Sequence, residues 1–127
     1  MDYNWEGKTI VVVDDIEINY ILIKKQLEKT KAIILWLENG QEIVNYVSEN
    51  KKADLILMDI RMPLMDGFEA TKRIKKTHPN IRIIFQTAYI IGTEFEMIER
   101  SECDDYIIKP IDAHKLIKLI EKQFNTN

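Results

Sequence analysis

Hydrophobic residues in this chain form short continuous runs that alternate with longer segments of helical periodicity. Five of the runs have the length and composition of β-strands, at residues 9–13, 32–37, 54–58, 81–85 and 105–108. The first run, Thr-Ile-Val-Val-Val, is β-branched at every position, which is typical of a strand buried on both faces of a sheet. The pattern therefore predicts five strands, of which the first lies inside the sheet.

The segments between and after these runs predict five amphipathic helices. They cover about 16–29, a stretch after Asn39-Gly40, 66–77 with Asp66 as N-cap, about 93–100, and the end of the chain. Their inward stripes are Ile16, Tyr20, Ile23 and Leu27; Ile43, Val44 and Val47; and Leu116, Ile117, Ile120 and Phe124. Regular alternation of strand and helix predicts an α/β fold, a parallel sheet with helices on both faces and right-handed crossovers.

Composition narrows the class of protein. The 127 residues fit a single domain, 1–127 with a core of about 8–124, and 46% hydrophobic with 31% charged residues is a globular composition. A net charge of −3 gives no reason to expect nucleic-acid binding through this domain. No uncharged stretch approaches the roughly 18 residues of a membrane span, so we expect no membrane contact.

The single cysteine and the N-terminal residues indicate the cellular compartment of the protein. Cys103 cannot form an internal disulfide, which fits a reducing environment, and it is expected to be a small buried hydrophobe. The acidic start Met1–Glu6 lacks the basic and apolar regions of a signal peptide. We therefore expect a cytoplasmic location.

Polar residues whose side chains can take part in binding or catalysis follow the predicted strands. Asp14 and Asp15 end the first run, Asp59 ends the third, and Thr87 and Lys109 follow the fourth and fifth. Open parallel sheets bind ligands beyond the carboxyl ends of their strands, so these side chains are expected to converge. Three crowded carboxylates and a lysine indicate a metal-assisted site that accepts a phosphoryl group. Taken singly, Asp14-Asp15 would more often be a helix N-cap and Lys109 a solvated charge.

Four motifs in this order resemble the receiver domain of two-component response regulators. They are Val13-Asp14-Asp15, the segment from Leu57 to Gly67 (LMDIRMPLMDG), Phe85-Gln86-Thr87-Ala88, and the segment from Asp104 to Pro110 (DDYIIKP). The resemblance covers about residues 8–124. It implies a flavodoxin-like (βα)5 fold, a doubly wound parallel sheet with strand order 2-1-3-4-5, and helices divided two and three between its faces.

The resemblance also implies a phosphoacceptor chemistry. Asp59 would take a phosphoryl group from a phosphohistidine on a histidine kinase or a histidine phosphotransfer domain, and the domain would be a switch rather than an enzyme. Asp14, Asp15, Asp59 and the backbone carbonyl of Arg61 would hold Mg²⁺. Lys109 would hold the phosphoryl group, and Lys109-Pro110 is expected to be a cis peptide.

In such receivers a switch pair transmits phosphorylation to the surface. Here the pair would be Thr87 and Tyr106, and the surface would be formed by the fourth helix, fifth strand and fifth helix, which is also a candidate homodimer face. Two positions that influence phosphoryl loss are Arg61 and Tyr89. Neither is a carboxylate or an amide that would orient water, so we expect a long-lived phosphoryl group.

Two segments depart from the family pattern. Ser101-Glu102-Cys103 stands where a glycine is common, and the segment is either a helical continuation or a differently shaped loop. The segment 90–93 (Ile-Ile-Gly-Thr) is unusually apolar, which fits either packing under the fourth helix or a phosphorylation-dependent docking surface.

The first helix helps to decide which subgroup of receivers the chain resembles. Ile18 and Leu22, an i, i+4 pair, are expected to lie partly off the core. In receivers of hybrid sensor kinases this end of the helix docks the kinase or the phosphotransfer domain. The segments 85–89 and 4–8 also resemble that subgroup, so we favour a hybrid-kinase receiver, with a stand-alone relay receiver as the alternative.

Two other functions compete with this interpretation. A phosphorylation-independent, receiver-like interaction module would be signalled by loss of a metal ligand or of the lysine, and all are present. A haloacid-dehalogenase-type hydrolase would need an acid two residues after the nucleophile, where this chain has Arg61, and a cap domain that 127 residues do not accommodate.

Overall fold

The computed structural model describes residues 3–88 and 92–125, which fold around one parallel sheet. The sheet order is β2-β1-β3-β4-β5, as predicted. The strands are β1 Thr9–Val13, β2 Ile33–Leu37, β3 Leu55–Asp59, β4 Arg82–Thr87 and β5 Asp105–Ile108. β4 runs two residues beyond its predicted end, so Thr87 is the last residue of the strand and not the first of the loop.

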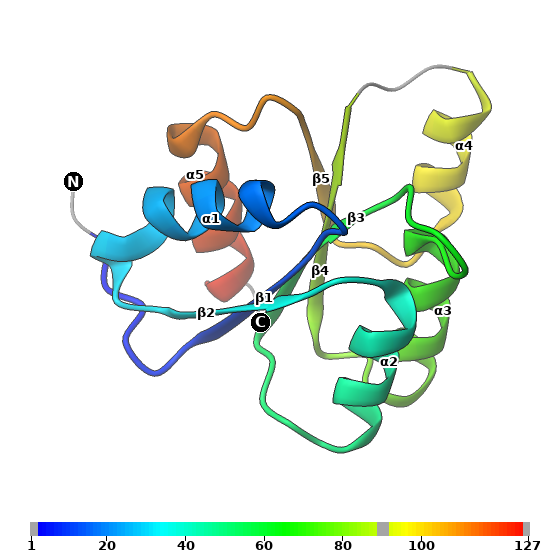
Figure 1. The fold of residues 1–127 in the computed structure, drawn as a ribbon, viewed down its shortest axis with the longest axis horizontal. Helices are drawn as coiled ribbons and strands as arrows, with labels where there is room; N and C mark the ends of the chain where they lie inside the picture. The colour runs from blue at the N-terminus through cyan, green and yellow to red at the C-terminus, as the bar shows by residue number, and fades with distance from the viewer. Residues whose placement is uncertain (1–2, 89–91, 126–127) are drawn as a thin grey trace.

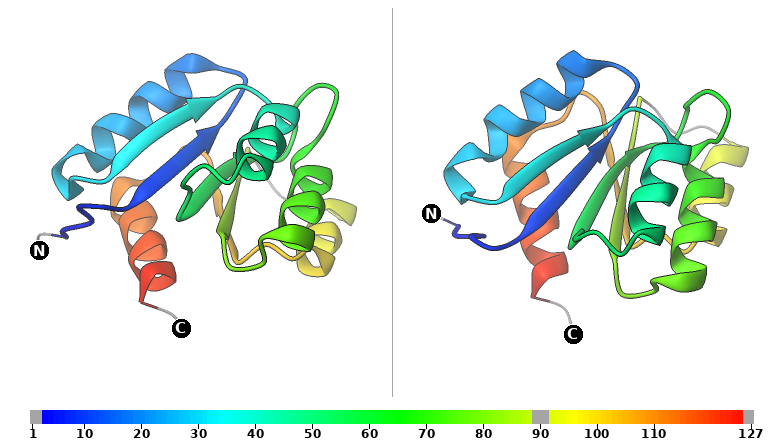
Figure 2. Two further views of the ribbon diagram at one scale, coloured as in Figure 1. Left: turned by 90° about the horizontal axis from the view of Figure 1, so that it is seen from below. Right: turned by 60° about the horizontal axis from the view of Figure 1, so that its bottom comes forward.

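The helices follow the strands in strict alternation. They are α1 Glu17–Leu27, continued by a short 3-10 helix η1 Glu28–Thr30, α2 Gly40–Ser48, α3 Gly67–Thr77, α4 Thr93–Arg100 and α5 Ala113–Phe124. α1 and α5 cover one face of the sheet, and α2, α3 and α4 cover the other (Figures 1 and 2). This two-and-three division confirms the flavodoxin-like (βα)5 architecture.

A separate hydrophobic core lies on each face because side chains alternate along the strands. Ile10 and Val12 of β1 point toward α1 and α5, where they join Leu116. Val11 and Val13 point toward α2 and α3, where they join Phe85 of β4. All five residues of β1 are buried, which confirms the prediction of an internal strand.

Side-chain caps begin α2, α3 and α5, whereas α1 and α4 start without one. Asp66 caps α3 by accepting a hydrogen bond from the Glu69 N–H, as predicted, and Asn39 caps α2 in the same way. α1 has no side-chain cap. The alternative of a helix cap at Asp15 is therefore wrong. Ile16 precedes the helix and is exposed, so its assignment to the inward stripe is also wrong.

The connection between α4 and β5 is a loop and not a helical continuation. α4 ends at Arg100, and the next residue, Ser101, has extended backbone angles. Its N–H donates to the carbonyls of Met97 and Ile98. Cys103 packs partly buried against the core on the α2–α4 side, and this burial raises the pKa of its thiol. Of the helices described, none is both long and apolar enough to cross a membrane.

Candidate functional site

The parallel register places the acidic strand ends side by side. Val13 of β1 pairs with Met58 of β3, so Asp14 and Asp59 come next on neighbouring strands. Carboxylate oxygens of Asp14, Asp15 and Asp59 all lie within 4.8 Å of one another. The convergence predicted from the sequence is therefore confirmed in space.

Asp14 is held rigidly at the centre of this cluster. It is completely buried, its Oδ1 accepts from the Ile16 N–H at 2.9 Å, and its Oδ2 accepts from the Asn19 amide at 3.1 Å. Its backbone carbonyl accepts a 2.8 Å hydrogen bond from Nε1 of Trp36. These contacts hold both the side chain and the backbone of Asp14, and they leave its orientation little freedom.

Lys109 completes the site from the end of β5. Its backbone N–H donates to the Thr87 carbonyl at 2.7 Å, and the Lys109–Pro110 peptide is cis, as the resemblance implied. The Lys109 ammonium lies 3.3 Å from Asp14 Oδ2 and 3.7 Å from Asp59 Oδ2. One cation thus contacts two of the three clustered carboxylates.

The surplus of negative charge in the site affects the pKa of Asp59. The pKa of its carboxyl is raised from 3.8 to about 6: burial is the main cause, repulsion from Asp14 and Asp15 adds to it, and Lys109 opposes it. A site with hard oxygen donors and a surplus of negative charge suits Mg²⁺, which prefers a few carboxylates and completes its shell with water and phosphate oxygens. The observed donor set therefore fits the expected metal.

A sequence profile described as the response regulator receiver domain matches residues 10–121. The chain belongs to this receiver family. It is homologous to phosphoacceptor domains of histidine kinases and response regulators, which act in two-component signalling.

Relatives of this receiver occur both inside large kinases and alone. It is 33% identical over 116 residues to the polar-differentiation response regulator DivK of Brucella anthropi, covering 90% of this chain and 94% of DivK. It is 30% identical over 136 residues to the probable histidine kinase 5 of Oryza sativa subsp. japonica, covering 90% of this chain. The chain spans only 12% of that kinase and 13% of the sensor protein GacS of Pseudomonas syringae pv. syringae.

A solved receiver has the same fold. The receiver domain of the sensor histidine kinase PA1611 from Pseudomonas aeruginosa matches with a TM-score of 0.85 and 26% identity, over 94% of this chain and 99% of that one. That structure holds a magnesium ion coordinated in its active site cleft.

The predicted switch residues of this receiver lie on the neighbouring strands β4 and β5. Thr87 is buried, and its hydroxyl donates to Glu94 Oε1 at 3.0 Å. Tyr106 is half-buried against the core on the α2–α4 side. Arg61 lies two residues after Asp59, and its guanidinium binds Glu94 Oε2 at 2.6 Å. Tyr89, together with Ile90 and Ile91, lies outside the described residues.

The β3–α3 loop holds the phosphoacceptor end of the receiver in place. The Gly67 N–H donates to the Ile60 carbonyl at 2.8 Å, and a Cβ on Gly67 would lie 2.7 Å from the Asp59 carbonyl oxygen. A glycine is therefore required where α3 starts against the end of β3. Leu64, at the tip of this loop, is fully exposed.

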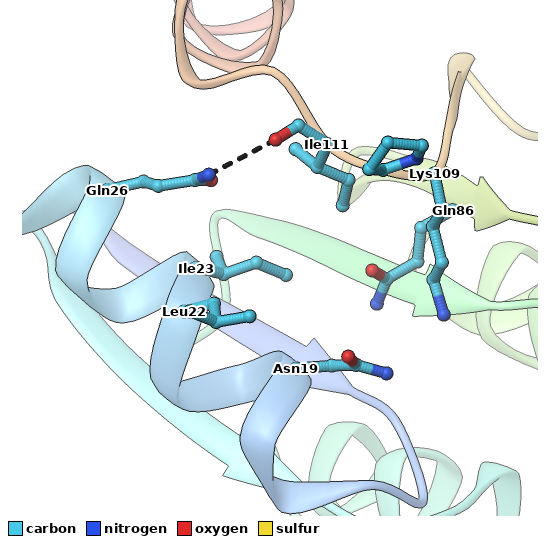
Figure 3. A pocket seen from close by; sticks show the side chains of 8 residues that line it. Asn19, Leu22, Ile23, Gln26, Gln86, Lys109 and Ile111 are labelled. Carbon is cyan, nitrogen blue, oxygen red and sulfur yellow. Dashed lines mark hydrogen bonds between the residues drawn. The ribbon is translucent and has the colours of Figure 1, made fainter.

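A pocket of about 210 Å³ opens beside Lys109, between α1 and the loop from β5 to α5. Figure 3 shows Leu22 and Ile23 of α1 on one side and Ile111 on the other, with Gln86 and Lys109 at one end. The Gln26 amide donates to the Ile111 carbonyl at 3.1 Å and joins the two sides. Ile18 and Leu22 are about half exposed, which confirms their predicted position off the core.

Three residues of the site were not predicted from the sequence. Trp36 is recognisable only from the β1–β2 pairing, which puts it opposite Val12 and near the Asp14 carbonyl. Asn19 lies in the first turn of α1, where polar residues are common. Glu94 is an acid at a helix start, which is ordinary helix composition. Only the assembled fold gives these residues their roles.

Proposed function

We propose that Asp59 accepts a phosphoryl group from a phosphohistidine on a histidine kinase or a histidine phosphotransfer domain, as one step of a His-Asp phosphorelay. One observation carries the proposal. At the end of a buried strand, the Asp59 carboxylate lies in a cluster with Asp14 and Asp15 and 3.7 Å from the Lys109 ammonium. Every charged group that the chemistry requires is present, which argues against a module that works without phosphorylation.

The chain's own residues account for the transfer. An oxygen of the Asp59 carboxylate attacks phosphorus, the P–N bond to the donor imidazole breaks, and the imidazole leaves with the bonding electron pair. The Lys109 ammonium neutralises charge on the oxygens of the group in transit. Asp14, Asp15, Asp59 and the Arg61 carbonyl would hold Mg²⁺, which when bound adds positive charge opposite those oxygens.

Phosphorylation would then act through Thr87 and Tyr106. The Thr87 hydroxyl would turn to a phosphoryl oxygen, and Tyr106 would move into the space it leaves. Moving a two-state equilibrium from 1:99 to 99:1 takes about 5.5 kcal/mol, which a few charge-assisted hydrogen bonds can supply. The affected surface, α4-β5-α5, exposes Phe95, Met97 and Ile108 and is our candidate output and homodimer face.

The phosphoryl group should be long-lived. Arg61 and Tyr89, the two rate-influencing positions, carry no carboxylate or amide to orient an attacking water. A phosphoryl half-life of minutes or more in Mg²⁺ is expected, and decay within seconds would refute this part of the proposal.

The donor would approach over α1 and the pocket beside Lys109. Ile18, Ile21 and Leu22 expose apolar surface on α1. Leu22 also lines the pocket that has Lys109 at its end (Figure 3). Exposed apolar patches near a reactive group are typical of docking surfaces. The kinase relatives support a receiver within a hybrid kinase, and DivK supports a stand-alone one. A cytoplasmic location is part of the proposal.

The proposal is tested by intact mass after incubation with a small phosphodonor, with and without Mg²⁺. The wild type is expected to gain one phosphoryl group only with Mg²⁺, and Asp59→Asn is expected to gain none. A wild type that binds Mg²⁺ but gains nothing, even from a phosphorylated histidine phosphotransfer domain, would overturn the proposal in favour of an interaction module.

A further inference from the structure

Glu94 is a buried carboxylate with both of its oxygens in use. It lies in the first turn of α4 and is only 8% exposed. Its Oε1 accepts from the Thr87 hydroxyl at 3.0 Å, and its Oε2 accepts from the Arg61 guanidinium at 2.6 Å. A carboxylate so far removed from water is stable only while such partners remain.

The two partners of Glu94 come from the two segments that flank the phosphoacceptor. Arg61 follows Asp59 by two residues in the β3–α3 loop, and Thr87 ends the adjacent strand β4, where Gln86 is paired with Asp59. A hydroxyl and a guanidinium are also the donors that a phosphoryl group binds best. A phosphoryl group on Asp59 and the Glu94 carboxylate therefore compete for the same two donors.

We propose that Glu94 is a positioning residue that latches the unphosphorylated state: it holds Thr87 and Arg61 together and gives both up when Asp59 is phosphorylated. The inference rests on the proposed function and deepens it by naming what opposes the switch. The added phosphoryl charge repels the Glu94 carboxylate while it attracts the donors. Both effects favour release.

The position of Glu94 also explains how release reaches the surface. Because Glu94 belongs to α4, the latch ties the start of that helix to β4 and to the β3–α3 loop. A hollow of about 480 Å³ lies between the loop and α4, lined in part by Ile60, Phe68 and Met97. The hollow leaves room for the start of α4 to shift once Glu94 is free.

A latch that opposes the phosphorylated state makes a directional prediction. Glu94→Gln keeps the size of the side chain but removes its charge, and it leaves one acceptor oxygen where the carboxylate offers two to Thr87 and Arg61. The variant should bind a phosphoryl mimic more tightly than the wild type, because less interaction is lost on switching. General damage to the site would weaken binding, so tighter binding is a result that a merely structural role does not produce.

The experiment is a titration with beryllium trifluoride in saturating Mg²⁺, followed by calorimetry. Glu94→Gln is expected to bind three- to tenfold more tightly than the wild type, on the order of the difference between charged and neutral hydrogen bonds. The matched control is Glu96→Gln, an exposed carboxylate on the same helix, which should bind as the wild type does.

A second readout uses the unaltered protein, in case the variant fails to fold. The ¹⁵N signal of the Arg61 Nε should shift when beryllium trifluoride binds, because the guanidinium exchanges Glu94 for the mimic. An unshifted Arg61 signal, or equal or weaker binding by Glu94→Gln while the wild type binds, overturns the latch and leaves the phosphoacceptor function intact. A wild type that neither binds the mimic nor accepts a phosphoryl group overturns both.

Discussion

The protein environment of Asp59 opposes the negative charge of its carboxylate. Burial is the main cause of its raised pKa, and the Asp14 and Asp15 carboxylates add to it, while Lys109 offsets only part. In the metal-free protein the ionised form of Asp59 is therefore unfavourable in the folded state. A bound cation or a neutralised phosphoryl oxygen relieves the same imbalance. The surplus of negative charge therefore both destabilises the metal-free fold and favours metal binding and phosphorylation.

This imbalance predicts a pH-dependent stability difference between the wild type and Asp59→Asn. Because the folded pKa of about 6 exceeds the ordinary 3.8, stability contributed by protonated Asp59 is present below about pH 4 and lost as the pH rises through 6. In EDTA, Asp59→Asn should therefore match the wild type near pH 4 and exceed its free energy of unfolding by about 1–2 kcal/mol at pH 7.5, after allowance for solvent screening.

Urea denaturation at a series of pH values measures this difference. Glu96→Gln, which removes an exposed carboxylate, is the control and should show no such trend. Adding Mg²⁺ at pH 7.5 should stabilise the wild type more than Asp59→Asn, because the metal binds the native state. A difference that is the same at every pH would refute the assigned electrostatics of Asp59.

The predictability of the site also differs from residue to residue. Asp14, Asp15, Asp59 and Lys109 could be located from the sequence because each follows a hydrophobic run, and parallel strands bring their carboxyl ends together. Asn19, Trp36 and Glu94 could not, because a hydrogen bond between distant segments leaves no periodic trace in the sequence. The hydrogen bond from the Thr87 hydroxyl to Glu94 could not be predicted either, since it depends on where α4 starts.

At the scale of elements, the contact between β3 and α3 fixes the phosphoacceptor. Asp59 ends the strand, and the chain turns within a few residues into a helix capped by Asp66. Gly67, the first residue of α3, lies so close to the strand that a Cβ would meet the Asp59 carbonyl oxygen at 2.7 Å and the Ile60 Cα at 3.0 Å. Both are backbone atoms that cannot rotate away.

Gly67→Ala is therefore expected to push α3 away from β3. The free energy of unfolding should fall by about 1–3 kcal/mol, as in other overpacked sites, and phosphorylation of Asp59 should slow. Urea midpoints measure the first effect and initial rates with a small phosphodonor the second. Lys72→Ala, at an exposed position of the same helix, is the control, and a Gly67→Ala midpoint equal to that of the control would contradict the packing argument.

Elements with strong periodicity were predicted more accurately than the connections between them. All five strands and five helices are present, and β1 matches its predicted bounds. The sequence does not decide between a helical continuation and a loop after α4, because Ser101 and Glu102 are compatible with either. What ends the helix is a pair of hydrogen bonds from the Ser101 N–H to the last turn, which the residue types alone do not reveal.

In the molecule as a whole, the proposed docking surface for the phosphoryl donor and the proposed output surface lie on different sides of the site. The proposed donor surface is α1 with the pocket beside Lys109, and the proposed output surface is α4-β5-α5. Lys109 lines the donor pocket and contacts Asp59, whereas Glu94 connects Thr87 to α4. Donor docking and phosphoryl chemistry can therefore be separated by mutation.

Leu22→Glu should separate them. A charge on the α1 surface is expected to slow transfer from a phosphorylated histidine phosphotransfer domain roughly tenfold, because it disrupts an apolar contact, while phosphorylation by a small donor stays unchanged. Ile33→Glu is the control, since Leu22 and Ile33 are both 53% exposed. Ile33 is the first residue of the edge strand β2, at the end of the sheet opposite the site. Equal slowing with both donors would show damage to the site, and no slowing would exclude α1 from docking.

The most direct test of the whole account is to locate the phosphoryl group. After phosphorylation in Mg²⁺, reduction with borodeuteride converts an aspartyl phosphate to a deuterated homoserine, which peptide mass spectrometry assigns to one position. We expect the label at Asp59, and only when both donor and Mg²⁺ were present. Label at Asp14, at Asp15 or at any other carboxylate, or a Mg²⁺-dependent mass gain with no reducible aspartyl phosphate, would contradict it.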